Sequence, residues 1–315
     1  MVVSKCFGFE KCRYNGITIY DDFVEKLKPY VEYITVCPEV EIGLGVPRDP
    51  IRVVSEQGDL RLKQPASEKD VTDMMKEFCN AFLTSINVVD GFLLKARSPS
   101  CGIKDVKIYP SMEKSAALGK GMGFFGRTVW ERFPQFPIED EGRIKNFRIR
   151  EHFLTKLFIT AKFREMNTSP SMKALVKFHT ESKFLLMACS QKQLKILGQI
   201  VANHEKRRTS EAFELYRTHL FNAFSIPTRY TSNINVLMHS MGYFSEKLSS
   251  KEKQFFLDSL EKYRAGKIPL SVNLGILKSW ITRFEEAYLA QQDYFEPYPE
   301  GLVEITDSGK GRKLS

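Results

Sequence analysis

The feature that most constrains how this chain folds is a change of pattern near its middle. Residues 1–148 alternate short β-type runs with amphipathic helical stretches, whereas helical periodicity continues almost unbroken from there to about residue 291. Strands that alternate with helices are typical of βαβ units and a parallel sheet. A succession of helices joined by short breakers is typical of an all-α domain. We therefore predict an α/β N-terminal domain with a mainly parallel sheet, followed by an all-α C-terminal domain.

The expected domain boundaries follow from this change of pattern. A chain of 315 residues is about twice the size of a common single domain, which favours two domains. We expect a catalytic domain over 1–148, a linker or helix over 149–168, a helical domain over 169–305, and a disordered tail over 306–315. That tail contains the polar stretch SGKGRKLS.

The expected elements of the first half are five strand regions and three helices. The β-branched and apolar runs predict strands at 2–5, 31–36, 88–95 and 106–109, and a hairpin at 51–55 with 60–63. Amphipathic spacing and capping residues predict helices at 22–30, 70–86 and 124–133. In the second half, helices are expected at 151–164, 170–188, 190–206, 210–224, 232–247, 250–264 and 273–291.

The bulk properties of the chain indicate a cytoplasmic protein. It contains no run of about 18 apolar residues that would span a membrane, and its first residues, MVVSKCFGFEKCRYNG, are too charged for a signal peptide. Thiols stay reduced in the cytoplasm, and six cysteines are too sparse for a disulfide scaffold. Cysteines at informative positions are therefore expected to be ligands or nucleophiles.

Three of these cysteines follow predicted strands. Cys6, Cys37 and Cys101 each lie just beyond the carboxyl end of a strand, where ligands bind in open parallel sheets. We predict that they converge on one soft-metal site, although any one of them taken alone is more typical of a small buried packing residue. Cys79 and Cys189 lie on helices and are expected to pack. Cys12 lies in the loop EKCRYNG with no strand to place it, and it is the candidate for a fourth ligand.

The residue types around the three cysteines narrow the chemistry of the site. All five histidines lie at position 152 or beyond, and no CxxC pair is present, so a closed four-ligand zinc site is not indicated. Three thiolates suit an iron–sulfur cluster with one open iron, which is a Lewis acid. Glu39, two residues after Cys37, is either a general base or an ordinary surface carboxylate. Ser98 and Ser100 are hydrogen-bonding candidates beside Cys101.

Several separated motifs in residues 1–145 resemble the thiouracil desulfidase family. They are SKCFGFEKCRYNG at 4–16, CPEV at 37–40 with the following GLGVPR, KARSPSCG at 95–102, and the stretch that ends in ERFPQFPIEDEGRI. The resemblance implies a 4Fe-4S cluster on Cys6, Cys37 and Cys101 and a redox-neutral removal of sulfur from a thiolated pyrimidine. It implies that Glu39 is the catalytic carboxylate and that a motif serine also acts, with Ser98 favoured and Ser100 retained.

The second half is similar to the YbgA-type helical domain often fused to this desulfidase. The matching stretches include Asn235–His239, Tyr263-Arg264 and the segment YLAQQDYFEPYPEGL at 288–302. The fusion implies desulfuration of thiouridine in transfer RNA, 4-thiouridine above all. Residues 151–315 contain 24 Lys and Arg against 17 Asp and Glu, a net charge of +7, which independently favours a polyanionic partner. The candidate RNA contacts are Lys183, Lys206, Arg207 and Arg208.

Two alternatives remain open on these residues. The same chemistry on free thiouracil or a thionucleoside is the first, although a small substrate does not require a basic helical domain. The second is a non-enzymatic RNA-binding or redox-sensing protein whose metal site is structural, with Cys12 as a closing ligand. An open coordination position that faces Glu39 would favour the enzyme.

Overall fold

The structure, a computed structural model, describes residues 1–304 and 306–307. The chain divides into two compact units, one built from Met1–Phe153 with the segment that begins at Gly301, the other from Leu154–Glu300. Each unit is described by itself. The expected boundaries at 148, 168 and 305 stay predictions, and most of the expected tail, 308–315, lies outside the described residues.

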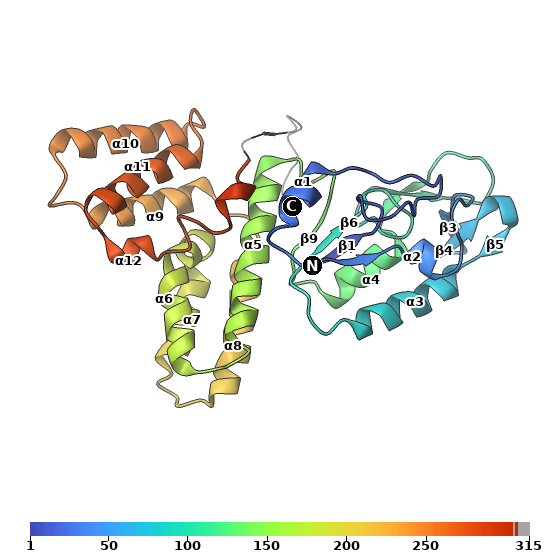
Figure 1. Cartoon of the computed structure of the whole chain (residues 1–315), viewed down its shortest axis with the longest axis horizontal. Coiled ribbons are helices and arrows are strands. Elements are labelled where there is room, and N and C mark those ends of the chain that lie inside the picture. The colour runs from blue at the N-terminus through green and yellow to red at the C-terminus, as the bar shows by residue number, and fades with distance from the viewer. Residues whose placement is uncertain (305, 308–315) are drawn as a thin grey trace. The chain divides into compact units, whose positions relative to one another are not determined.

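The first unit contains a parallel sheet of four short strands in the order β2-β1-β6-β9 (Figure 1). All three pairings are parallel, with Val3 opposite both Thr35 and Leu93. Because the chain moves from β1 to β2 on one side and then returns to β6 on the other, the strand order reverses between β1 and β6. The carboxyl ends of these two strands are the topological switch point, where α/β sheets bind their ligands. The strands are β1 Val2–Ser4, β2 Ile34–Val36, β6 Phe92–Leu94 and β9 Ile138–Asp140.

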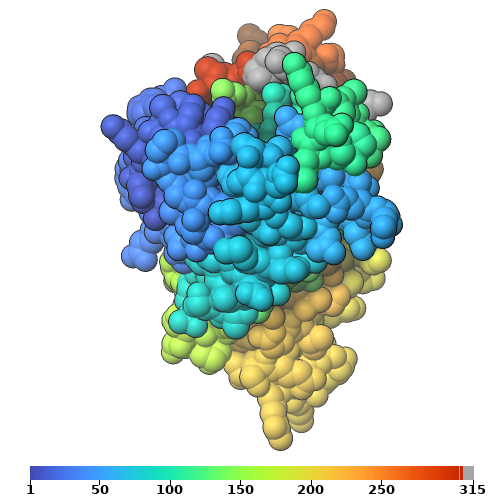
Figure 2. Space-filling view, turned by 90° about the vertical axis from the view of Figure 1, so that its right-hand side faces the viewer, coloured from blue at the N-terminus to red at the C-terminus, as the bar shows by residue number. Residues whose placement is uncertain are grey.

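A second, mixed sheet in the same unit has the order β5-β4-β3-β7-β8. The predicted hairpin is its centre, with Glu56 paired to Asp59 across the turn. The chain from this hairpin through α3, coloured blue to cyan, covers much of the face seen in Figure 2. The strands are β3 Arg52–Glu56, β4 Asp59–Gln64, β5 Lys69–Asp70, β7 Val106–Tyr109 and β8 Gly119–Gly121, and a 3₁₀ turn, η1 Pro65–Ser67, links β4 to β5.

Helices pack against the parallel sheet, and the side chains between helices and sheet form the core of this unit. Side chains of α3 and α4, including Met75 and Phe125, pack with Phe92 and Leu94 of the sheet in one buried cluster. In Figure 1, α1 lies on the other side of the sheet from these two helices. Asp21 caps α1 by accepting a hydrogen bond from the Val24 amide at 3.1 Å. The helices are α1 Asp22–Leu27, α2 Pro38–Glu41, α3 Thr72–Ser85 and α4 Phe124–Arg132.

The second unit is helical, around a large aromatic core. The rings of Phe163 and Tyr216 stack with their centroids 5.7 Å apart, and Phe256 meets Trp280 at 5.2 Å. Helix α5 begins in the first unit and continues into the second. The helices are α5 Phe147–Met166, α6 Met172–Cys189, α7 Gln191–Ala202, α8 Thr209–Ala223, α9 Tyr230–Gly242, α10 Ser250–Arg264, α11 Leu270–Arg283 and α12 Ala287–Ala290, with the 3₁₀ turn η2 Glu300–Leu302 after them.

The predicted fold class is confirmed. In the first unit α2, β5 and β8 were not predicted, and two further differences concern the sheets. The predicted strand at 106–109 forms, but it belongs to the second sheet, where it pairs with β3. The fourth strand of the parallel sheet is instead β9, which the sequence pattern did not indicate because its residues are Ile138, Glu139 and Asp140. Among the described residues, no helix is both long enough and apolar enough to cross a bilayer.

Candidate functional site: thiols at the carboxyl edge of the sheet

The three predicted cysteines lie where parallel strands end. Cys6 follows β1 by two residues, Cys37 follows β2 directly and is the N-cap of α2, and Cys101 lies in the loop after β6. Cys6 and Cys101 are buried, with 8% and 5% exposed, and Cys37 is half-buried. All six cysteines of the chain are free thiols. The order of the strands thus brings these residues to one edge of one sheet.

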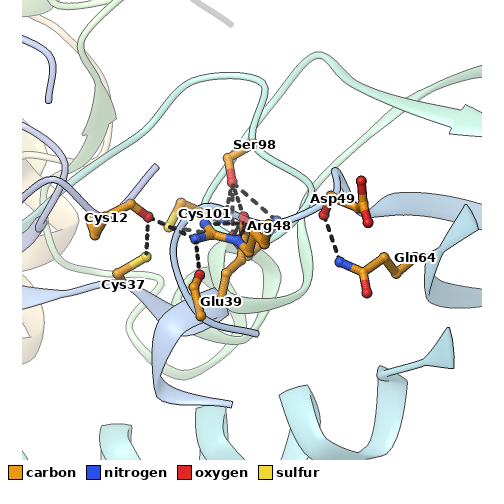
Figure 3. A network of polar contacts seen from close by, with 10 residues as sticks. Cys12, Cys37, Glu39, Arg48, Asp49, Gln64, Ser98 and Cys101 are labelled. Atoms are coloured by element: carbon orange, nitrogen blue, oxygen red, sulfur yellow. Dashed lines mark hydrogen bonds and ion pairs between the residues drawn. The ribbon is translucent and has the colours of Figure 1, made fainter. Parts of the chain in front are cut away.

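Cys12, which no predicted strand places, belongs to the same cluster. It is fully buried because the loop after β1 turns back, with the Glu10 amide bonded to the Lys5 carbonyl and the Cys12 amide to the Glu10 carbonyl. Its thiol interacts with those of Cys37 and Cys6. The Cys37 thiol also donates to the Cys12 carbonyl at 3.5 Å (Figure 3).

Burial and mutual contact raise the pKa of these thiols above the ordinary value. For Cys12 the largest influence, a hydrogen bond with Cys37, lowers the pKa, but the bond with Cys6 and burial outweigh it and raise the pKa to about 11. The contact with Cys12, followed by burial, raises the pKa of Cys37. Burial raises the pKa of Cys101 to about 12, although Ser4 and Ser100 act in the opposite direction. Metal binding would have to displace these protons, because the thiolate is the ligand.

The chemistry of the thiols bears on the kind of metal that they fit. No group of three or more histidine, cysteine or acidic side chains within the described residues is arranged to hold a single metal ion. Ligands of one ion all lie about 2.3 Å from it when they are thiolates, which requires a tight group. A cluster of several iron atoms separates its thiolates further and takes soft sulfur ligands. The free thiols of this edge are soft sulfur donors, and such donors suit an iron–sulfur cluster.

A carboxylate, Glu39, lies beside the thiols and is held from one side by an arginine. It stands in the first turn of α2, two residues after Cys37, and its side chain is 12% exposed. Arg48 donates from Nε and Nη2 to Glu39 Oε2 at 2.9 and 2.7 Å, and its own side chain is 4% exposed (Figure 3). Charge-assisted bonds of this kind are stronger than neutral ones and fix the orientation of the carboxylate.

The two motif serines meet the other oxygen of this carboxylate. Ser100 Oγ donates to Glu39 Oε1 at 2.7 Å, and Ser98 Oγ lies at 3.4 Å from the same atom. Ser98 Oγ also accepts bonds from the amides of Ser100, at 3.3 Å, and Cys101, at 3.1 Å. The carboxylate, the serines and Cys101 thus form one connected polar network.

Helix α4 supports the loop that contains Ser98, Ser100 and Cys101. The Gly126 amide donates to the Ser100 carbonyl at 3.0 Å and the Gly123 amide to the Gly102 carbonyl at 2.7 Å. A Cβ atom at Gly126 would lie 2.5 Å from the Gly102 carbonyl oxygen, so only glycine allows this approach. The glycine-rich run GKGMG at 119–123 ends in Gly123, and packing against this loop explains that glycine.

The candidate RNA contacts lie in the helical unit and do not form one group. Lys206 and Arg208 are exposed in the connection between α7 and α8, and neither has an ion-pair partner within the described residues. Arg207, between them, is half-buried and ion-paired with Glu205. Lys183 is exposed on α6, and no contact in the described part of the chain links it to the other three.

Reasoning from sequence named every member of the polar network except Arg48. That residue lies nine positions after Glu39, at the end of the GLGVPR motif, and no local periodicity relates the two. The one sequence signal for Arg48 was its position, because Arg48 and the candidate carboxylate Glu39 lie in the same connection between β2 and β3.

The fold and the site together define a class: an α/β protein with a buried thiol cluster and a carboxylate at the switch point of a parallel sheet. The 2-thiouracil desulfurase family model matches residues 1–141, and the model of a family described as a protein of unknown function, DUF1722, matches residues 183–299. The chain belongs to the 2-thiouracil desulfurase family, a family of desulfidase enzymes, and carries a YbgA-like helical domain fused to it. The predicted family resemblance is thereby confirmed.

Individual relatives cover the two parts of the chain separately. The uncharacterized protein YbbK of Bacillus subtilis strain 168 is 33% identical over 110 residues, which are 32% of this chain and 72% of YbbK. The uncharacterized protein YbgA of Escherichia coli strain K12 is 29% identical over 163 residues, 51% of this chain and 86% of YbgA. The solved structure of TudS, a [4Fe-4S]-dependent thiouracil desulfidase, is 26% identical and covers 46% of this chain and 91% of TudS, with a TM-score of 0.37.

Proposed function

We propose that this chain catalyses the redox-neutral desulfuration of thiolated uridine in tRNA, 4-thiouridine to uridine, with release of hydrosulfide. The observation that carries the proposal is that the strand-end thiols and the Glu39–serine network meet at one edge of the parallel sheet. Hydrolysis of a carbon–sulfur bond is assisted by a soft Lewis acid, which binds the sulfur atom, and by a base, which accepts a proton from water. A soft-metal site beside a carboxylate can supply both. Membership of a desulfidase family supports the same reaction class.

In this proposal Cys6, Cys37 and Cys101 hold a 4Fe-4S cluster, and Cys12 lies beside it as a buried neighbour. The support is the donor set, which consists of soft, free thiols that are buried or half-buried. When bound, a cluster with one open iron would supply a Lewis acid that takes a soft sulfur atom.

In this proposal the protein's own residues orient the attacking water and accept its proton. A water oxygen forms a new bond to the pyrimidine carbon, the carbon–sulfur bond breaks, sulfur leaves as hydrosulfide, and no electrons are exchanged. Glu39 is proposed to accept a proton of that water at Oε1, the oxygen that faces Ser100. Ser100, bonded to Glu39 at 2.7 Å, is placed to pass or orient that proton. Arg48 occupies the other oxygen.

The choice of tRNA as substrate rests on the helical domain. Residues 151–315 carry the net charge of +7, and two of the candidate contacts, Lys206 and Arg208, are exposed cations without an ion-pair partner in the described part of the chain. Unpaired cations of this kind neutralise phosphates and release counterions, which supplies most of the affinity of a protein for nucleic acid.

A second candidate is the same reaction on free 2-thiouracil or a thionucleoside. The description of the family that matches residues 1–141 names thiouracil itself, and this favours a small substrate. In that case the helical domain would have a role other than presentation of the base.

The test is a comparison of substrates under anaerobic conditions. The full chain, reconstituted with iron and sulfide, is incubated with tRNA that contains 4-thiouridine, with the free nucleoside and with 2-thiouracil, and hydrosulfide release is measured. We expect the highest kcat/KM on tRNA, and we expect Glu39→Gln to retain its iron while kcat falls on the order of 10²–10⁴-fold. Equal or higher kcat/KM on the free base would favour the second candidate. No release from any substrate by cluster-loaded protein would refute the desulfidase itself, and a structural metal site would remain.

A further inference from the structure

Arg48 is a buried and extensively hydrogen-bonded cation of the first unit, and no part of the argument from sequence required it. Its side chain is 4% exposed, and four hydrogen bonds hold its guanidinium. Nε and Nη2 donate to Glu39 Oε2, and Nη1 donates at 3.0 Å to each of two carbonyls, those of Cys12 and Gly45 (Figure 3). Arginine has five N–H donors, so this site uses nearly all of them.

The geometry divides the two oxygens of Glu39 between two tasks. Arg48 occupies Oε2 alone, whereas Oε1 accepts the bond from Ser100 at 2.7 Å. A guanidinium cannot give up its proton in a protein, so Arg48 is not itself a base. It instead prevents the carboxylate from rotating and leaves one oxygen turned toward the serines.

The same guanidinium links the carboxylate to the thiol cluster. The Cys12 carbonyl accepts from Arg48 Nη1 and also from the Cys37 thiol, at 3.5 Å. Arg48 therefore joins the loop of Cys12, the turn at Gly45 and the first turn of α2. A lysine has the charge but not the planar fork, and it could not make these bonds together.

We propose that Arg48 is the positioning residue of this site, which orients Glu39 so that Oε1 is the oxygen that exchanges a proton with the attacking water. This inference rests on the proposed desulfidase function and adds to it a residue and a division of roles between two atoms. A positioning role predicts a loss in the chemical step with substrate binding and cluster retention preserved. A merely structural role predicts a loss of iron and of thermal stability as well.

The experiment compares Arg48→Lys with Arg143→Lys in the reconstituted full chain. Arg143 forms a similar half-buried pair with Glu139, at 2.7 Å from Nε to Oε2, outside the thiol cluster, and it is the matched control. We expect Arg48→Lys to bind as much iron as the wild-type chain, to keep KM within about twofold and to lose on the order of 10²-fold in kcat, since misplacement of a reacting group by about 1 Å costs that much. Arg143→Lys should keep kcat within about twofold.

A second variant separates positioning from folding. In Arg48→Ala, added guanidinium ion should enter the space left by the side chain and restore kcat at least tenfold, and ammonium ion should not. The proposal is wrong if Arg48→Lys keeps wild-type kcat, or if both Arg48 variants lose iron and thermal stability together with activity and guanidinium restores none of it. Wild-type chain that contains the cluster and desulfurates nothing would refute the proposed function, a result distinct from either of these.

Discussion

At the scale of single residues, the structure gives the two motif serines different sets of hydrogen bonds. Ser98 Oγ accepts bonds from the amides of Ser100 and Cys101 and so caps the turn that holds Cys101. Ser100 is 1% exposed, and its hydroxyl donates to Glu39 at 2.7 Å. The sequence favours Ser98 for the chemical role, but these bonds lead us to propose Ser100 for that role and Ser98 for support of the loop.

This division predicts different results from the two alanine variants. Ser100→Ala should retain its iron and lose on the order of 10²-fold in kcat, because the shorter of the two serine bonds to Glu39 Oε1 is removed. Ser98→Ala leaves two amides without their acceptor and should cost about 1 kcal/mol of unfolding free energy and lower the iron bound, with kcat per iron nearly unchanged. Chemical denaturation, iron analysis and turnover measure all three quantities. The reverse assignment would follow if Ser98→Ala, with full iron, were the slower enzyme.

At the scale of elements, the cysteine loop depends on the close approach of helix α4. The amides of Gly123 and Gly126 bond to carbonyls of the loop that contains Ser98 and Cys101, and a Cβ atom at Gly123 would lie 2.5 Å from the Ser100 carbonyl oxygen. Backbone cannot yield as a flexible side chain can. A helix start without a side-chain cap is thus bonded to the segment that supplies a candidate ligand and the serine beside it.

This contact predicts that a single methyl group will disturb the site. We expect Gly126→Ala to cost about 1–3 kcal/mol of unfolding free energy through overpacking, and to bind less iron because the Cys101 loop is displaced. Gly119→Ala is the matched control, since a Cβ atom there meets nothing within 4 Å. Iron content and thermal midpoint should separate the two variants. If Gly126→Ala behaved like Gly119→Ala, the helix would not be what positions the loop.

The sequence predicted the positions of helices and strands better than it predicted strand pairing and tertiary contacts. Strands that end at Cys37 and near Cys6 follow from β-branched and apolar runs, and parallel pairing follows from the intervening helices. The membership of β9 does not, because a run of Ile138 and two acidic residues has no strand pattern and pairs only through its neighbour β6. Cys12 and Arg48 reach the site through turns whose geometry depends on tertiary contacts, and local patterns do not describe such contacts.

At the scale of the whole molecule, the charge of the helical unit is the property that would distinguish a tRNA enzyme from an enzyme for small substrates. The exposed cations Lys206 and Arg208 lie on one connection, between α7 and α8. Arg207 between them is ion-paired with Glu205, and we therefore expect a smaller part from it in RNA binding than the sequence suggested.

Charge reversal at this connection should affect RNA and spare small substrates. We expect Lys206→Glu with Arg208→Glu to weaken tRNA binding about 10- to 100-fold and to reduce the slope of log K against log salt by about 1.5, since each phosphate contact contributes about 0.7–0.9. Turnover of free 4-thiouridine should not change. Lys251→Glu with Lys267→Glu, at two other exposed lysines of the same unit, is the control. Equal effects of the two double variants would indicate nonspecific charge rather than a binding site.

The central claim concerns the thiols at the edge of the sheet, and iron analysis of single cysteine variants tests it most directly. After anaerobic reconstitution the wild-type chain should bind about four iron and four sulfide per chain, as a 4Fe-4S cluster requires. Cys6→Ala, Cys37→Ala and Cys101→Ala should each lose most of this iron, whereas Cys12→Ala should keep it. Cys79→Ala, at a buried cysteine on α3, is the control for loss of a buried thiol. Retention of the cluster by Cys101→Ala together with its loss from Cys12→Ala would contradict the account.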